Sequence, residues 1–249
     1  MADGWGAAVL LGLLVLVGSS VQRLAGMGFA LVCGPALVLL LGPGDGVTLS
    51  NCAACVISAI GLAGSWRQVR LGRMLPLMAA AACTVPIGAR VADRVPPPTL
   101  LIGIGLLVTA AALLVIRGIR ASSLRGLRGA VAAGAASGFM NSAAGVGGPA
   151  VSLYAVNTGW TAREFVPNAQ LYGVVVNIFS IAAKGVPHLP APAWSTTAAG
   201  IALGAVVGRS PSDRVTERPA RLVVLTLALA GGLVTLAKGL WELWSSGDS

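Results

Sequence analysis

Long apolar runs, separated by one or a few charged residues, occupy most of the chain. Nine stretches contain no Asp, Glu, Lys or Arg, and they cover residues 4–22, 24–44, 46–66, 74–89, 95–116, 129–162, 165–183, 185–208 and 222–237. An α-helix needs about 20 apolar residues to cross a bilayer. Eight runs fit one helix each, while the longest, 129–162, must hold two segments divided at Gly145–Pro149. The pattern predicts about ten hydrophobic segments, some of them half-helices.

The overall composition predicts an all-α polytopic membrane protein with the lipid bilayer as its surroundings. Hydrophobic residues make up 56% of the chain and charged residues 10%, whereas a soluble domain carries roughly a quarter of its residues as charges. The 34 Gly and 14 Pro are ordinary for membrane helices that pack closely or break. A net charge of +9 would suit nucleic acid, but no basic stripe with interleaved aromatics is present, so no nucleic-acid partner is expected.

The distribution of Lys and Arg predicts the orientation in the membrane. With ten segments and the N-terminus outside, 13 of the 17 cationic residues fall in inside loops, and the outside loops hold only Arg90, Arg94, Lys184 and Lys238. Inside loops of membrane proteins carry the excess of Lys and Arg. We therefore expect a multi-pass protein of the cell membrane with its N-terminus outside.

Short motifs recur about 119 positions apart, which predicts an internal duplication. Residues 1–122 and 123–249 would form two repeats of about five segments each, together making one transmembrane domain. Because five is odd, the repeats would be inverted, a plan of secondary transporters whose substrate site lies near the midplane at the repeat interface. The alternative is that Gly/Ala-rich helices look alike by chance. The matching pairs are 22–28 with 141–147, Ser50-Asn51 with Pro167-Asn168, 93–95 with 213–215, and Arg117-Gly118 with Lys238-Gly239.

A glycine cluster in the second repeat, Gly145, Gly147 and Gly148 followed by Pro149, is a candidate anion site. Pro is favoured in the first turn of a helix, and a helix that restarts inside the membrane aims free N–H groups and a positive dipole end at the interior. Such a site needs no cationic side chain. The alternative is close helix packing through small residues. Gly26 and Gly28 are the weaker counterpart in the first repeat.

Several polar side chains near these breaks are candidate anion ligands. Gln22 and Asn141 directly precede the two breaks, and an uncharged amide can donate two hydrogen bonds. The alternative is a hydrogen bond between helices, worth about 1 kcal/mol. Arg23 would bind an anion if the chain breaks before crossing the membrane, and would otherwise be an interfacial cation. The further candidates are Asn51, Ser142, Asn168 and Gln170.

The sequence does not predict an enzyme, a metal site or a cofactor. An intramembrane enzyme needs a nucleophile with a base, or paired carboxylates, at membrane depth. The single histidine, His188, lies in a Pro-rich loop, and every acidic residue bounds a segment or lies in a loop or tail. The classes left open are a transporter for small anions, a passive anion channel and a non-transporting scaffold subunit.

The run Gly138–Pro149, followed by Asn168-Ala-Gln170, resembles the TauE/SafE family of sulfite and organosulfonate permeases. The first repeat, with Gly26, Gly28 and Asn51, is a looser copy of the same pattern, so the resemblance covers nearly the whole chain. It implies a membrane transporter, expected to be an exporter, for sulfite, sulfoacetate or similar small anions. Asn141 stands where the family often has an acidic residue. A small-residue face, Ala130–Ala136, could pack against a second copy in a homodimer.

Overall fold

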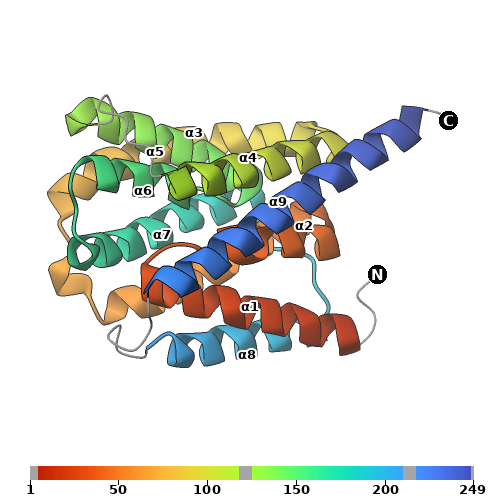
Figure 1. The fold of residues 1–249 in the computed structure, drawn as a ribbon, viewed down its shortest axis with the longest axis horizontal. Coiled ribbons are helices and arrows are strands. Elements are labelled where there is room, and N and C mark those ends of the chain that lie inside the picture. Colours follow the sequence, from red (N-terminus) through yellow and green to blue (C-terminus); the bar gives the residue numbers. More distant parts are fainter. Residues whose placement is uncertain (1–4, 118–124, 210–216, 248–249) are drawn as a thin grey trace.

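The structure is a computed structural model that describes residues 5–117, 125–209 and 217–247. Within those residues all regular secondary structure is helical, without strands (Figure 1). The elements are α1 (Trp5–Ala25), α2 (Phe29–Ala63), the 3₁₀ turn η1 (Trp66–Gln68), α3 (Leu71–Arg94), α4 (Pro97–Arg117), α5 (Gly126–Ala144), α6 (Gly148–Asn157), α7 (Ala162–Lys184), α8 (Ala191–Val207) and α9 (Glu217–Gly247).

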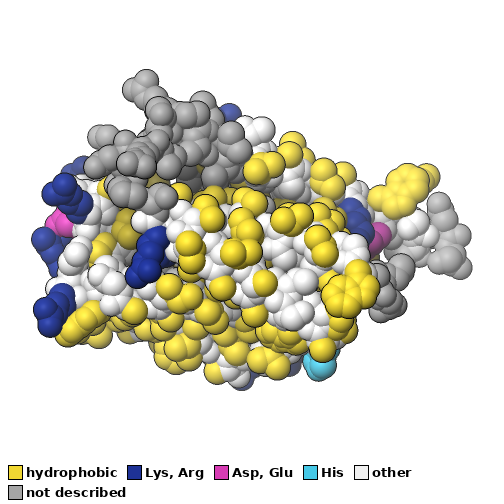
Figure 2. Space-filling view, turned by 90° about the horizontal axis from the view of Figure 1, so that it is seen from below, with side chains coloured by type: hydrophobic (Ala, Val, Ile, Leu, Met, Phe, Trp, Pro, Cys, Tyr) yellow, Lys and Arg dark blue, Asp and Glu magenta, His cyan; other side chains and the backbone are white. Residues whose placement is uncertain are grey.

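The helices form a multi-pass membrane protein, as the sequence predicts. Five of the described helices, α1, α2, α3, α4 and α7, are long and apolar enough to cross a bilayer. Large apolar side chains such as Leu13, Ile178 and Leu203 are more than half exposed. Figure 2 shows a broad hydrophobic surface between two ends where the charged side chains gather. An apolar surface of this extent faces lipid in the folded state.

The expected segments match the helices, except that two of them are underestimated. The label α2 covers two helices, residues 29–41 and 43–63, that fold back on each other at Gly42, where φ is 83° and ψ is 166°. The runs 24–44 and 46–66 are therefore two segments as expected, and the first half has its own short second helix and long third helix. The short run 74–89 underestimates α3, because that helix also includes Arg73, Arg90 and Arg94 near its two ends. The run 222–237 likewise underestimates α9, which also includes Lys238 and Glu242. Long cationic side chains can extend from a helix end toward water, so a charge does not end a membrane helix. The expected boundary between residues 122 and 123 lies outside the described residues.

The helices are arranged as a central pair with three pairs around it (Figure 1). α2 and α7 lie in the middle, and α1 packs on α8, α3 on α5, and α4 on α9. Small residues allow the close approach of the outer pairs: a Cβ atom at Gly200 of α8 would stand 2.5 Å from the Gly12 carbonyl oxygen of α1. Van der Waals packing of this kind drives helix association in lipid.

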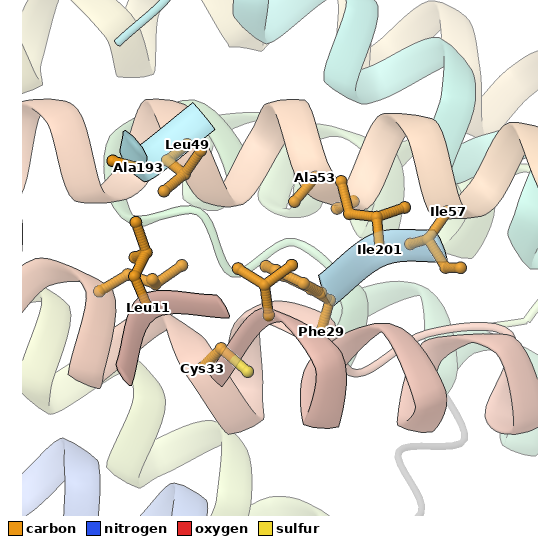
Figure 3. Close-up of a cluster of buried hydrophobic side chains, with 11 residues drawn as sticks. Leu11, Phe29, Cys33, Leu49, Ala53, Ile57, Ala193 and Ile201 are labelled. Carbon is orange, nitrogen blue, oxygen red and sulfur yellow. The ribbon is translucent and has the colours of Figure 1, made fainter. Parts of the chain in front are cut away.

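Three apolar clusters fix the outer pairs on the central pair. The first joins α1, α2 and α8, with Leu11, Phe29, Ile57 and Ile201 among its side chains (Figure 3). The second joins α2 to α4 and α9, and the third joins α3, α5, α6 and α7. The face Ala130–Ala136 is partly used within the chain, because Ala130 and Ala133 are buried in the third cluster. A homodimer through that face stays a prediction.

Candidate functional site

The chain breaks between α5 and α6 in the way that the glycine cluster predicts. Gly145 has a φ of 75°, a left-handed conformation that favours glycine. Its N–H donates to the Asn141 carbonyl at 2.8 Å, and the N–H of Val146 donates to the Met140 carbonyl at 3.3 Å. These bonds terminate α5, and α6 begins three residues later with Pro149 in its first turn.

The N-terminus of α6 has no side-chain cap. The first-turn N–H groups of a helix have no partner within that helix, so those of α6 face the break. Ser137, fully buried on α5, donates from Oγ to the Gly147 carbonyl at 2.7 Å and holds the break in place. The buried Tyr172 hydroxyl lies beside Ser137 without completing a hydrogen bond of ordinary geometry. The break therefore presents donors to the protein interior.

A cluster of buried polar side chains lies next to this break, and we call it the outer amide cluster. Asn141 Nδ2 lies 3.0 Å from Asn177 Oδ1, 2.9 Å from Ser180 Oγ and 3.5 Å from Asn51 Oδ1. An amide nitrogen carries two hydrogens, so it satisfies at most two of these acceptors at once. The longest contact, with Asn51, is the weakest of the three. Asn51 is consequently the least engaged member of the outer amide cluster.

Two polar groups beside the break have no hydrogen-bond partner in the described part of the chain. They are Asn51 Nδ2 and Ser50 Oγ, and both residues are about 1% exposed. Ser50 Oγ lies 3.6 Å from the position that a Cβ atom would take at Gly145. An unsatisfied buried donor costs about 1–3 kcal/mol. An anion at the break would satisfy these groups.

The first break, between α1 and α2, is closed by the chain itself. Gln22 Oε1 accepts from the N–H of Phe29 at 3.1 Å, so a side chain occupies the N-terminus of α2. Gln22 Nε2 donates to Ser58 Oγ at 2.6 Å and to the Ala54 carbonyl at 3.1 Å, and Gln170 Nε2 donates to the Gln22 carbonyl at 3.3 Å. We call Gln22, Ser58 and Gln170 the inner amide cluster. All of the Gln22 amide is used, while the buried Gln170 Oε1 has no partner among the described residues.

The two clusters have the same internal spacing. Gln22 contacts Ser58 and Asn141 contacts Asn177, each across 36 positions. The same shift of 119 positions that relates Gln22 to Asn141 also relates Asn51 to Gln170. Sequence similarity instead matches Asn51 with Asn168, and the contacts do not follow that alignment.

Members of both amide clusters lie along the crossing of α2 and α7. A Cβ atom at Gly173 of α7 would stand 2.5 Å from Ser58 Oγ, and one at Gly61 of α2 would stand 2.6 Å from Gln170 Cδ. Cys55 Sγ lies 3.9 Å from the Val174 carbonyl, on the side of these two contacts that faces the outer amide cluster. The glycines leave room for the polar side chains of the facing helix.

The two breaks also touch. A Cβ atom at Gly148, the first residue of α6, would lie 3.5 Å from Cβ and Sδ of Met27 in the first break. An apolar side chain thus lies where the two breaks meet. The hollow of about 250 Å³ between α3, α4 and α5 is a different feature, because side chains such as Leu100, Ile104 and Phe139 make its lining almost wholly apolar.

The candidate residues from the sequence fall into two groups. Gln22, Gly26, Gly28 and Gln170 meet at the first break, and Asn51, Asn141, Gly145, Gly147, Gly148 and Pro149 meet at the second. Asn168 joins neither group, since it bonds to the N–H of Arg70 at 2.9 Å and to the Glu164 carbonyl at 2.6 Å. The Ser142 hydroxyl bonds back to Gly138 of its own helix at 3.1 Å. Arg23 lies in the last turn of α1 with Nε buried and without a partner among the described residues.

The sequence reasoning missed several polar side chains of the two clusters. They are Ser50, Ser58, Ser137, Asn177 and Ser180. Ser50 directly precedes the candidate Asn51, and the others are single polar residues inside apolar runs. Only Ser58 and Asn177 carry a signal, namely the spacing of 36 positions from the residue before each break.

Paired helix breaks and buried amides at the centre of a multi-pass helical protein are features of the membrane transporters with broken helices. A family model described as "Sulfite exporter TauE/SafE" matches residues 10–235. The chain therefore belongs to the TauE/SafE family, whose members are membrane transporters for sulfite and organosulfonates and not enzymes. No curated protein and no solved structure gave a significant match.

Proposed function

We propose that this protein exports a small sulfur oxyanion, such as sulfite or sulfoacetate, across the cell membrane. Membership of the TauE/SafE family supports the substrate class. The observation that carries the finer assignment is a pair of buried groups, Ser50 Oγ and Asn51 Nδ2, which have no partner among the described residues and lie beside the break that precedes the uncapped α6. The N-terminus is proposed to lie outside, in keeping with the excess of Arg in the inside loops.

The chemistry of the second break suits an oxyanion. A sulfite or sulfonate group presents three oxygens that accept hydrogen bonds and donate none when ionised. The break offers donors of three kinds, namely the first-turn N–H groups of α6, the Asn51 amide and the Ser50 hydroxyl. Anions bind at helix N-termini because the N–H groups and the helix dipole act together. We place the substrate at this break, with Asn141 orienting the amides around it.

We further propose that the two halves of the chain are inverted repeats. Two observations support this: α1 packs on α8 as α3 packs on α5, and both amide clusters use contacts across 36 positions. In such a plan the substrate site lies at the repeat interface. The contact of Met27 with Gly148 would then separate the half of the substrate pathway that faces one side of the membrane from the half that faces the other.

The proposal is tested by calorimetric binding to the purified protein in detergent. Sulfite, sulfoacetate, taurine and sulfate are titrated separately. The Asn141→Ala variant should bind sulfite about 10- to 150-fold more weakly, since the Asn51 amide, no longer oriented by Asn141, would lose a hydrogen bond to a charged group, which is worth about 1.5–3 kcal/mol. Asn168→Ala is the matched control, because Asn168 is bonded at the inner end, and it should bind like the parent.

Equal affinity in the parent and the Asn141→Ala variant would place the site elsewhere. If none of the four anions binds, the substrate assignment fails. Flux into liposomes separates a carrier from a passive channel. A carrier saturates with sulfite and shows counterflow, whereas an open channel shows neither.

A further inference from the structure

The ends of the first and third helices of each half meet at a junction, and each junction holds a cation. In the second half, Lys184 is the last residue of α7 and its Nζ donates to the Ser142 carbonyl of α5 at 3.1 Å. That carbonyl belongs to the last turn of α5, where no intrahelical partner is available. The charge of Lys184 therefore stands at the C-terminal end of α5, beside the second break.

In the first half the cation comes from the other helix. Arg23 lies in the last turn of α1, and one of its terminal nitrogens, Nη2, lies 3.8 Å from the Cβ position of Gly64, which follows α2. Arg23 and Ser142 are equivalent under the shift of 119 positions, and so are Ser65 and Lys184. The same junction thus carries a positive charge in both halves, supplied by the first helix in one and by the third helix in the other.

Neither cation is neutralised by an ion pair within the described residues. The ion pairs there involve other cations, for example Lys238 with Glu242 at 3.7 Å. Asp93 is the acid that interacts electrostatically with Lys184, but it lies beyond ion-pair distance, and Arg23 has a second cation, Arg209, nearby. A cation without a paired acid attracts anions.

We propose that Lys184 and Arg23 are two anion-holding positions, one on each side of the central amide clusters. An oxyanion rests at Arg23 on the inner side and at Lys184 on the outer side, before and after it passes the breaks. This inference rests on the proposed transport of a sulfur oxyanion. It adds Lys184 to the anion pathway and gives each cation a defined side of the membrane.

The test is sulfite transport in right-side-out and inside-out membrane vesicles, with the half-saturating sulfite concentration measured from each face. Lys184→Gln should raise the outer value about tenfold and leave the inner value unchanged, while Arg23→Gln should do the reverse. Lys238→Gln is the matched control at the outer end, since Lys238 is already paired with Glu242, and both of its values should equal those of the parent.

A double variant that gives the first junction the residues of the second distinguishes an effect of charge from a loss of packing. Arg23→Ser combined with Ser65→Lys moves the inner cation from the first helix to the third and should restore the inner value. Equal changes from both faces, or none, in the single variants would overturn the inference while sulfite transport by the parent still stands. No sulfite transport by the parent would overturn the proposed function itself.

Discussion

A methyl group added at position 147 should destabilise the protein, whereas the same change at position 148 should not. At Gly147 the new Cβ would stand 2.7 Å from Ser137 Oγ, 2.8 Å from the Ser137 carbonyl oxygen and 2.9 Å from Asn141 Cβ. At Gly148 its nearest contacts are Met27 Cβ and Sδ at 3.5 Å, which is ordinary packing. Position 147 therefore has no room for a methyl group, whereas position 148 has room for one.

The expected cost at position 147 has two parts. Carbon atoms pack at about 3.5–4.0 Å, so α6 must move away from α5, and overpacking of this kind costs about 1–3 kcal/mol. The movement also stretches the Ser137–Gly147 hydrogen bond of 2.7 Å, which is worth about 1 kcal/mol. The φ of Gly147 is −88°, so its backbone conformation adds no penalty. Gly147→Ala should therefore lose about 2–4 kcal/mol of unfolding free energy.

Two variants calibrate that value. Gly148→Ala should lie within about 0.5 kcal/mol of the parent, as expected for a change without a clash. Gly145→Ala meets no atom closer than 3.6 Å but keeps a φ of 75°, so it should lose the 1–2 kcal/mol typical of a left-handed L-residue. The assay is denaturant-induced unfolding in detergent micelles, followed by tryptophan fluorescence. A Gly147→Ala variant as stable as Gly148→Ala would refute the geometry of the second break.

Three further predictions concern stability, topology and driving force. Gln22→Leu should lose about 2 kcal/mol of stability in the same unfolding assay, because it removes the cap of α2, yet it should weaken sulfite binding less than Asn141→Ala does in calorimetry. With the native cysteines replaced, Gly44→Cys and Gly72→Cys should react with an impermeant thiol reagent from opposite sides of the membrane, since both positions are open; labelling from the same side would contradict the topology. Sulfite export from liposomes should follow an imposed potential, which supplies about 2.3 kcal/mol per charge per 100 mV; transport that follows only a proton gradient would contradict it.

The prediction that the membrane potential drives export rests on where the acidic side chains lie. Asp45, Glu164 and Glu242 have their side chains at helix ends, where they pair with basic groups. None of the acidic side chains that the structure describes lies in either amide cluster.

The helix break at Gly145–Gly147 could be predicted because its cause is local. Glycine permits the left-handed conformation, and proline sits readily in a first turn, so the residues themselves mark the place. Gln22 and Asn141 were predicted from their position relative to those glycines. The amide clusters around them depend on contacts between distant helices, and a lone Ser58 or Asn177 in an apolar run leaves no local signal.

Asn168 shows the opposite error: the similarity between repeats predicts it as a site residue, but helix packing places it away from both clusters. Its match with Asn51 depends on a shift of 117 positions, two fewer than the shift that relates the cluster members. On a helix, two residues correspond to more than half a turn, which moves a side chain to another face. Asn168 accordingly bonds to Arg70 near η1 and not to the central residues. Register between repeats is decided by packing across α2 and α7, which local identity does not encode.

The crossing of α2 and α7 links the two amide clusters mechanically. The inner cluster lies on one side of the Cys55–Val174 contact, and the outer cluster lies on the other. A small rotation of α7 about this contact would separate the helices at one cluster and press them together at the other. Because Gly61 and Gly173 leave no spare space against Gln170 and Ser58, compression on one side resists further opening on the other. If the proposed anion pathway passes both clusters, its two halves would then open in turn and not together, which is the requirement for moving an anion without leaking it.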